Sequence, residues 1–245
     1  MIPNVIHYCW FGGKPLPESA LKCINSWKKY LPDYEIIRWD ESNFDVRAVP
    51  YISQAYDAGK YAFVSDYARF CILHAHGGIY FDTDVEVVSP IDDILETGPY
   101  MGCEHMLSGD VAVNPGLGMA AEPGMAFLSQ MIEKYCRLNF RKEDGSLDMT
   151  TIVSYTTDAL SAEGFVCDDT LQRCCGFNIY PTEYFCPLDY RTGKLTMTRN
   201  TRTIHHYAAT WHTPKDKWIR FKRIFFTESQ IKKISAFLNR FRKKH

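Results

Sequence analysis

Long apolar runs are missing from this sequence. No stretch approaches the roughly 20 consecutive apolar residues that a helix needs to cross a bilayer, so we expect no membrane span. The beginning of the chain also lacks the basic segment and apolar core of a secretory signal. Internal repeats and low-complexity segments are absent too, which argues against solenoid and disordered classes. These absences predict an ordinary cytoplasmic globular protein.

A disulfide framework is not expected either. The sequence has nine cysteines, an odd number, at scattered positions and without any C-x-x-C pair. Several of them fall in apolar stretches. We therefore predict reduced thiols that are mostly buried, as in cytosolic proteins.

The charge is nearly balanced over the whole chain but unevenly distributed along it. With 245 residues, of which 46% are apolar, the chain can bury a full core in one domain. Its net charge is −1, yet residues 215–245 carry +9 and the remainder −10. An acidic body with a basic tail indicates that the tail meets an anionic partner. We divide the chain into a domain at 1–212 and a basic amphipathic helical tail at 213–245.

The tail has two interpretations. The segment T-E-S-Q at 227–230 has the form of a capping box, so a helix should begin there. Apolar residues then recur on one helical face, and Lys and Arg occupy the rest. That face either packs on the domain or lies on an anionic membrane surface, where each basic residue adds about 1 kcal/mol.

Alternating strand and helix patterns predict an α/β fold. A strand at 4–10, an amphipathic helix at 18–31 and a strand at 34–39 have the spacing of a βαβ unit. The inward face of this helix is expected to carry Leu21, Ile24, Trp27 and Leu31. Further helices are predicted at 50–58, 125–138 and 150–163, and further strands at 85–88, 100–104, 110–113 and 203–206.

The stretch at 65–88 organises the rest of the chain. It begins with an amphipathic helix that Gly77-Gly78 ends, because glycine adopts the left-handed backbone of a helix C-cap without steric cost. A short apolar strand, Ile79 to Phe81, follows and brings Asp82-Thr83-Asp84 to its C-terminal end. In open α/β sheets this edge is where ligands bind.

Asp82 and Asp84 have three interpretations. Where a strand breaks into a turn, carboxylates spaced i, i+2 can converge on one hard cation such as Mg²⁺ or Mn²⁺, and substrate phosphates then complete its shell. A plain surface turn is the alternative, because Asp is common in turns. The pattern also matches haloacid-dehalogenase-type (HAD-like) phosphatases, with Asp82 as nucleophile and Asp84 as acid. That motif normally lies near the start of its domain, whereas about a third of the chain precedes it here.

The sequence S-D-Y-A-R-F-C-I-L-H-A-H-G-G-I-Y-F-D-T-D at 65–84 resembles the core of the DXD sugar-transferase family. This is glycosyltransferase family 32 with its relatives among capsular polysaccharide glycosyltransferases, initiating mannosyltransferases and large clostridial toxins. The resemblance covers roughly 2–88 and 205–211 and leaves 105–200 unmatched. It implies a GT-A type fold with a mixed, mostly parallel sheet flanked by helices. It also implies a nucleotide-sugar donor, Mn²⁺ or Mg²⁺ as cofactor, and retention of anomeric configuration.

The resemblance gives roles to residues of the central stretch and the first strand. Asp66 and Arg69, spaced i, i+3 on one helix face, would contact the donor sugar, the alternative being a surface ion pair. Asp82 would touch the ribose and the metal-bridged phosphate, and Asp84 would bind the metal directly. Trp10 would stack on the nucleotide base, the alternative being a core tryptophan.

Two further assignments lie at the edges of the site. Asn43 would contact the nucleotide, or would act as a helix N-cap. The Gly- and Ala-rich segment at 114–124 would form a loop on the acceptor side, by fold analogy alone.

The segment after the last predicted strand resembles the end of the family's catalytic core. There Trp211 would cover the diphosphate, and His206 would join the metal shell. The third protein ligand is left open between His206, His205 and water, because toxin-type members have Asn and Ser where this chain has other residues.

Together these patterns predict a metal-dependent retaining glycosyltransferase. It would move a sugar from a nucleotide-sugar donor, with a UDP-sugar favoured, to a glycan acceptor that a membrane lipid could carry. Capsular or other surface polysaccharide synthesis is the expected context, in the cytoplasm or peripheral at the inner membrane face, without a nucleic-acid partner. The alternatives are a HAD-like phosphatase that uses Asp82 and Asp84, and a non-catalytic sugar-nucleotide binder.

Overall fold

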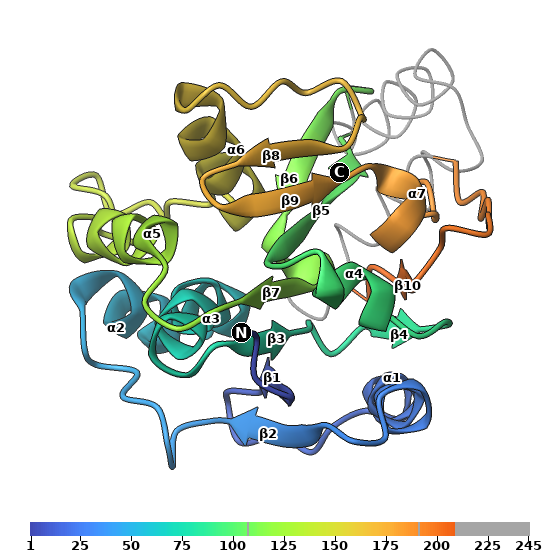
Figure 1. The fold of residues 1–245 in the computed structure, drawn as a ribbon. Coiled ribbons are helices and arrows are strands. Elements are labelled where there is room, and N and C mark those ends of the chain that lie inside the picture. The colour runs from blue at the N-terminus through green and yellow to red at the C-terminus, as the bar shows by residue number, and fades with distance from the viewer. Residues whose placement is uncertain (107, 191, 209–245) are drawn as a thin grey trace, which may run out of the picture.

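The structure is a computed structural model that describes residues 1–106, 108–190 and 192–208 (Figure 1). The predicted tail at 213–245 and the assignment of Trp211 lie outside these residues. The strands are β1 Val5–Cys9, β2 Glu35–Trp39, β3 Gly78–Tyr80, β4 Val85–Val87, β5 Tyr100–His105, β6 Val111–Asn114, β7 Met119–Ala121, β8 Gln172–Cys174, β9 Phe177–Tyr180 and β10 Thr203–His205. The helices are α1 Glu18–Tyr30, α2 Pro50–Asp57, α3 Tyr61–His76, α4 Asp92–Glu96, α5 Ala126–Cys136, α6 Ile152–Ala162 and α7 Thr182–Phe185, with a 3₁₀ turn at Pro115–Leu117.

One mixed sheet runs through the described part of the chain, in the order β2-β1-β3-β7-β5-β9-β8, with β6 paired to β5. Strand β1 is parallel to β2 and β3, and β5 is parallel to β9. The pairs that join β7 to β3 and β5, β6 to β5, and β8 to β9 are antiparallel. A separate antiparallel pair joins β10 to β4. The predicted α/β class with a mixed sheet flanked by helices is confirmed.

The βαβ unit at the start of the chain is also confirmed, since β1 and β2 pair in parallel from Val5 opposite Glu35 to Cys9 opposite Trp39. The prediction for the inward face of α1 was wrong at one position, because Leu21 is 46% exposed. The residues that α1 buries are Ala20, Cys23, Ile24 and Trp27. Their spacing defines a stripe that leaves Leu21 beside it, so the helix is rotated slightly from the predicted face.

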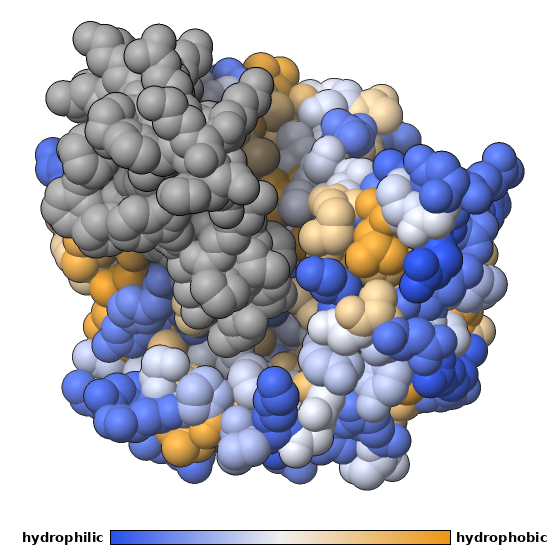
Figure 2. Space-filling model, turned by 180° about the vertical axis from the view of Figure 1, so that it is seen from behind, coloured by the Kyte–Doolittle hydropathy of each residue, from blue (hydrophilic) through white to orange (hydrophobic). Residues whose placement is uncertain are grey.

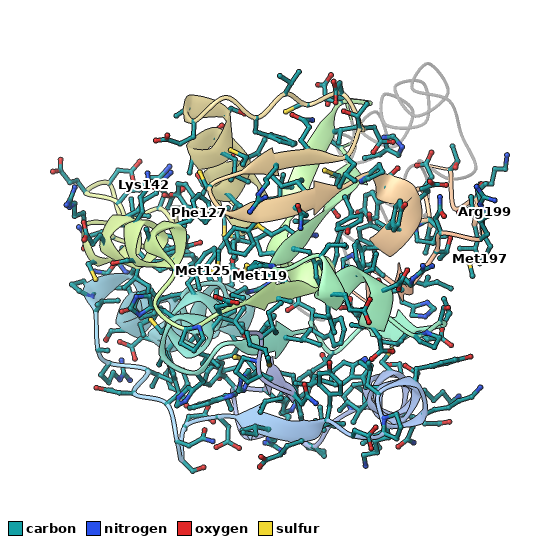
Figure 3. All side chains as sticks on the ribbon, viewed as in Figure 1. Met119, Met125, Phe127, Lys142, Met197 and Arg199 are labelled. Atoms are coloured by element: carbon teal, nitrogen blue, oxygen red, sulfur yellow. The ribbon has the colours of Figure 1, made fainter. Side chains whose placement is uncertain are left out.

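The helices cover both faces of the sheet, and each layer has its own core. Residues of α2, α3, α5 and α6 pack in one buried cluster, and residues of α1, α4, α7 and β4 pack in the other (Figure 1). Met119 on β7 and Phe127 on α5 belong to the first cluster, and Met125 packs against it (Figure 3). The central strands are therefore buried on both sides.

The segment at 114–124 was predicted to be a loop, but it is not a simple loop in the structure. It contains the 3₁₀ turn and then β7, which lies in the middle of the sheet between β3 and β5. The strand is only three residues long and two of them are alanines, so it lacks the β-branched and aromatic residues that mark a strand in sequence. The acceptor-side assignment of this segment stays a prediction.

A second region that the sequence analysis left without strands is the antiparallel pair β8 and β9. Its turn is Cys175-Gly176, where both residues have positive φ, 51° and 84°. Two positive φ angles are the mark of a tight hairpin turn, for which Asn-Gly or Asp-Gly is the usual sequence signal. With cysteine in the first position, that signal is missing.

Membrane and thiol predictions can be compared with the described residues. Within 1–106, 108–190 and 192–208, no helix combines the length and apolarity that crossing a bilayer requires. The view from behind shows a largely hydrophilic surface broken by small apolar patches (Figure 2). All nine cysteines lie in the described part and none forms a disulfide; five are buried and two are exposed. The prediction of reduced, mostly buried thiols is confirmed.

His7 in β1 is a buried histidine with a structural role. Its Nδ1 accepts a hydrogen bond from Trp39 Nε1 at 3.0 Å, so its Nε2 carries the hydrogen and donates to the Gly77 carbonyl at 3.0 Å. Burial lowers the pKa of His7 to about 4; the Gly77 bond opposes this shift and the nearby His76 adds to it. The neutral ring joins β1, β2 and the end of α3.

This burial predicts a dependence of stability on pH. Because the folded pKa lies below the unfolded value, the unfolded chain takes up a proton first, and stability falls as the pH drops from about 6.5 to about 4. We expect His7 to account for a loss of about 3 kcal/mol over that window. Urea unfolding of the wild type and of His7→Gln at several pH values measures this loss. The difference between their free energies of unfolding should become smaller as the pH falls. A pH-independent difference for His7→Gln would contradict the prediction.

Candidate active site

The two aspartates of the central motif lie in a turn at the C-terminal end of β3, as predicted. The Asp82 amide donates to the Gly116 carbonyl at 3.1 Å, and the Asp82 carbonyl accepts from the Val85 amide at 3.1 Å. This turn joins β3 in the main sheet to β4 in the two-stranded sheet. The Asp82 and Asp84 side chains keep 30% and 19% of their surface exposed, so both can reach a ligand.

Behind Asp82, helix α3 provides a buried guanidinium that contacts two carboxylates. Arg69 is only 3% exposed, and its Nη2 lies 2.9 Å from Asp66 Oδ1 and 3.2 Å from Asp82 Oδ1. Its Nη1 donates to Asp82 Oδ2 at 3.3 Å, and the guanidinium lies 4.6 Å from the centre of the Tyr80 ring. Tyr80 also donates its hydroxyl to Asp82 Oδ1 at 3.1 Å. The surface ion pair that was the alternative for Asp66 and Arg69 is wrong, because both are buried.

The charges of this group depend on one another. Burial raises the pKa of Asp66 to about 7; the Arg69 charge opposes the shift and the Asp82 charge adds to it. Burial also disfavours the Arg69 cation and lowers its pKa. The charges of Asp82, Tyr80 and Asp66 outweigh burial and raise the pKa of Arg69, so it stays charged. One buried cation therefore lies between two carboxylates.

The turn at Asn114 to Gly116 packs directly against Asp82. Asn114 Oδ1 accepts from the Gly116 amide at 2.7 Å. A Cβ on Gly116 would collide with the Asp82 carboxylate, and it would come within 3.0 Å of Arg69 Nη1. Only glycine fits this close approach. The Asn-Pro-Gly turn was visible in the sequence, but nothing in the pattern placed it beside Asp82.

Asp84 is held by the end of β10. His205 Nε2 lies 3.3 Å from Asp84 Oδ1, and the Ala208 amide donates to Asp84 Oδ2 at 2.8 Å. Burial raises the pKa of Asp84, but the charge and hydrogen bond of His205 and the Ala208 amide outweigh it and bring the pKa down to about 2. Burial lowers the pKa of His205, but Asp84 outweighs it, and the net shift is upward. Asp84 is therefore ionised at neutral pH.

The two adjacent histidines point to different partners. His206 is 44% exposed, and its Nε2 lies 2.7 Å from Glu86 Oε2. His205 is the histidine beside Asp84, because successive side chains of a strand alternate between its faces. Of the three options left open for the third metal ligand, the structure brings His205 to Asp84 and does not bring the His206 side chain there.

Deeper in the site lies a buried cluster that the sequence analysis missed. A carboxylate oxygen of Glu104, the Cys186 sulfur and a ring nitrogen of His205 all lie within 4.8 Å of one another. The Tyr207 hydroxyl donates to Glu104 Oε2 at 3.1 Å and lies 3.0 Å from Cys186 Sγ. No sequence signal pointed to Glu104 or Cys186, because both lie far from the motif in the sequence and outside the two segments that resemble the family, 2–88 and 205–211.

The two residues assigned to the nucleotide lie at the ends of β1 and β2. Trp10 is half-buried, and its Nε1 donates to the Lys14 carbonyl at 2.6 Å. Asn43 is exposed and closes the turn after β2: its Oδ1 accepts from the Asp40 amide and its Nδ2 donates to the Arg38 carbonyl. The N-cap alternative for Asn43 is wrong, since the next helix begins at Pro50. Contact of either residue with a nucleotide stays a prediction.

The residues at this edge fit a hard divalent cation. Asp84 offers carboxylate oxygens and His205 offers a nitrogen next to them, and both kinds of ligand suit Mn²⁺ or Mg²⁺. Asp82 does not form one close group with these two: among the described residues, the group of three whose ligand atoms lie within 4.8 Å of one another is Glu104, Cys186 and His205. His205 Nδ1 is buried without a hydrogen-bond partner among the described residues. If Nε2 bound a metal, Nδ1 would carry the ring proton.

The structure thus shows an α/β protein with a carboxylate-rich candidate site at a strand end. Residues 17–100 match the family described as the glycosyltransferase sugar-binding region containing a DXD motif. The matched segment includes Asp66, Arg69, Asp82 and Asp84. The resemblance seen in the sequence is confirmed.

Several curated proteins are similar to parts of this chain. An uncharacterized glycosyltransferase of Acanthamoeba polyphaga mimivirus is 36% identical over 40% of this chain and 41% of its own length. Inositol phosphoceramide mannosyltransferase 3 of Schizosaccharomyces pombe is 32% identical over 57% of this chain and 38% of its own. The initiation-specific alpha-1,6-mannosyltransferase of Candida albicans is 24% identical over 64% and 43%. The chain spans about two fifths of the length of these relatives.

Solved structures also show similarity. The PaToxG glycosyltransferase aligns with a TM-score of 0.47 at 19% identity, over 66% of this chain and 70% of that one. The galactosyltransferase LgtC, solved with donor and acceptor sugar analogues, aligns with a TM-score of 0.38 at 14% identity, over 89% and 93%. The α/β class of this chain follows from its own strand pairing.

Proposed function

We propose that this protein is a metal-dependent glycosyltransferase of GT-A type that moves a sugar from a nucleotide-sugar donor to a glycan acceptor. One observation carries the proposal. Asp82 and Asp84 lie part-exposed at the end of a buried strand, in the segment that matches a DXD sugar-binding family. The buried Arg69 and Asp66 lie directly behind them. The family match favours this reaction over a HAD-like phosphatase that would use the same aspartates.

The described residues suggest how the site would work. Asp84 and His205, with Asp82 beside them, would hold a divalent cation, which supplies Lewis acidity toward the leaving diphosphate. The low pKa of Asp84 keeps its carboxylate charged for that task at neutral pH. Arg69 and Tyr80 fix the Asp82 carboxylate, which leaves Asp82 preorganised for the ribose and phosphate. Asp66 would accept hydrogen bonds from the donor sugar.

The finer features are part of the proposal. Transfer would retain the anomeric configuration, with the acceptor hydroxyl attacking from the leaving-group side, so no protein nucleophile is assigned. A UDP-sugar is our favoured donor, Mn²⁺ the favoured ion, and capsular or other surface polysaccharide the favoured product. Two relatives are named as mannosyltransferases, so mannose is included among the candidate sugars. The +9 charge at 215–245 supports a peripheral position at an anionic inner membrane face with a lipid-linked acceptor.

A thermal-shift screen of nucleotides and nucleotide sugars, each with and without Mn²⁺, tests the proposal. A ligand at 100 times its Kd should stabilise the protein by about 2.7 kcal/mol. We expect one nucleotide sugar to stabilise the protein strongly with Mn²⁺ and weakly with EDTA. Stabilisation by inorganic phosphate and phosphomonoesters alone, with no response to any nucleotide, would contradict the proposal and favour a phosphatase.

Trp10 gives a separate prediction about the base. If its half-buried indole stacks on the base, Trp10→Ala should weaken binding of the nucleoside diphosphate by roughly 1–3 kcal/mol. Isothermal titration of wild type and variant measures this loss. Trp39→Ala, which removes a half-buried indole at the end of the neighbouring strand, is the matched control and should leave the affinity nearly unchanged. Equal loss of stability in both variants, without a selective loss of affinity for Trp10→Ala, would make Trp10 a core residue.

A further inference from the structure

Glu104 is a buried carboxylate behind the two aspartates. It lies on β5, and a single oxygen, Oε2, accepts two hydrogen bonds: from Asn114 Nδ2 at 3.0 Å and from the Tyr207 hydroxyl at 3.1 Å. Burial of a carboxylate is costly unless it is hydrogen-bonded. Both of its partners belong to segments that hold the proposed metal site, one on the side of Asp82 and one on the side of Asp84.

The first connection runs from Glu104 to Asp82. Asn114, which Glu104 holds in place, accepts a hydrogen bond from the Gly116 amide at 2.7 Å. The Gly116 carbonyl in turn accepts a hydrogen bond from the Asp82 amide at 3.1 Å. Gly116 fits against the Asp82 carboxylate with no room for a side chain. Any movement of Asn114 would therefore be transmitted to Asp82.

The second connection runs from Glu104 to Asp84. Tyr207 has a φ of 49°, a left-handed conformation that a non-glycine residue adopts only when its surroundings hold it. Its hydroxyl is bound to Glu104, and its ring lies 4.2 Å from the ring of His205. The next residue, Ala208, donates its amide to Asp84 at 2.8 Å. Tyr207 therefore fixes the backbone that binds Asp84.

His205 completes the arrangement. Its Nε2 faces Asp84, and its Nδ1 is buried without a hydrogen-bond partner among the described residues. A Glu104 oxygen and the Cys186 sulfur lie within 4.8 Å of a ring nitrogen of His205, so Glu104 also lies close to the histidine that contacts Asp84.

We propose that Glu104 is a positioning residue for the metal site: one buried carboxylate that holds the Asp82 and Asp84 segments together through Asn114 and Tyr207. This inference rests on the proposed function. It predicts that Glu104 governs metal affinity without touching the metal, the donor or the acceptor.

Mn²⁺ titration of the full chain, followed by isothermal calorimetry and by the electron-spin resonance of free Mn²⁺, tests this inference. Glu104→Leu should weaken Mn²⁺ binding 10- to 100-fold, the range for residues that orient metal ligands. Glu104→Gln, whose amide oxygen can still accept, should recover most of that loss. Tyr207→Phe removes one connection and should weaken binding severalfold. Tyr155→Phe, which removes a tyrosine hydroxyl bound to Asp148 away from the site, should bind Mn²⁺ like the wild type.

The outcomes separate this inference from the proposed function. Thermal unfolding without metal shows whether each variant is folded; if Glu104→Leu is not, Tyr207→Phe decides the matter. If the wild type binds Mn²⁺ and the folded variants Glu104→Leu and Tyr207→Phe bind it with the same affinity, this inference is overturned and the proposed function is not. Glu104, Cys186 and His205 could instead bind a metal of their own. If Glu104→Leu abolishes Zn²⁺ binding and leaves the Mn²⁺ affinity unchanged, the inference is also overturned. A wild type that binds no Mn²⁺ overturns the proposed function, and the inference with it.

Discussion

Replacing Asp84 by Asn should reduce transfer and donor hydrolysis by roughly 10³-fold or more while the fold is retained. A metal that polarises a leaving phosphate contributes several kcal/mol to the transition state, and each 1.4 kcal/mol is a factor of ten in rate. The Asp84 carboxylate, ionised and next to His205 and the Ala208 amide, is the best-placed anion for that metal. Asn keeps the shape and removes the charge.

Steady-state release of nucleoside diphosphate measures this effect. Asp33→Asn, which changes an exposed aspartate before β2, is the matched control and should keep full activity. Thermal unfolding should show that Asp84→Asn is folded. Near-normal turnover by this variant, or full wild-type activity in EDTA, would remove the metal from the mechanism.

Replacing Arg69 by Leu should lower the free energy of unfolding by about 3–5 kcal/mol, because it leaves the Asp66 and Asp82 carboxylates without their buried cation. Arg137→Leu removes an exposed arginine that pairs with Glu133 and should cost less than about 1 kcal/mol. Urea unfolding of both variants measures the contrast.

A second substitution tests the cause of that loss. If the unpaired carboxylates destabilise Arg69→Leu, adding Asp66→Asn should recover part of the stability, since it removes the more deeply buried of the two carboxylates. Additive losses in the double variant would show that packing of the guanidinium, rather than its charge, stabilises this region.

The central stretch was predictable because its signals are local. A helix pattern, two glycines and an apolar strand lie next to one another in the sequence, and each specifies its own geometry. That order alone placed Asp82 and Asp84 at a strand end, and the i, i+3 spacing of Asp66 and Arg69 placed them on one helix face.

Contacts between distant segments were not predictable in this way. Glu104, Gly116 and Cys186 come close to the motif only through the packing of β5, β6 and the chain before β10, and no local pattern records those pairings. The choice between His205 and His206 depended on which face of a three-residue strand meets Asp84. A shift of one residue would exchange them.

The most direct test of this account is Mn²⁺-dependent turnover of the donor. The full chain is incubated with a panel of UDP- and GDP-sugars, and release of the nucleoside diphosphate is measured with Mn²⁺, with Mg²⁺ and with EDTA. The account predicts that at least one nucleotide sugar is hydrolysed slowly, that EDTA stops the reaction and that added Mn²⁺ restores it. Binding of a nucleotide sugar without any turnover, or phosphate release from phosphomonoesters in its place, would contradict it.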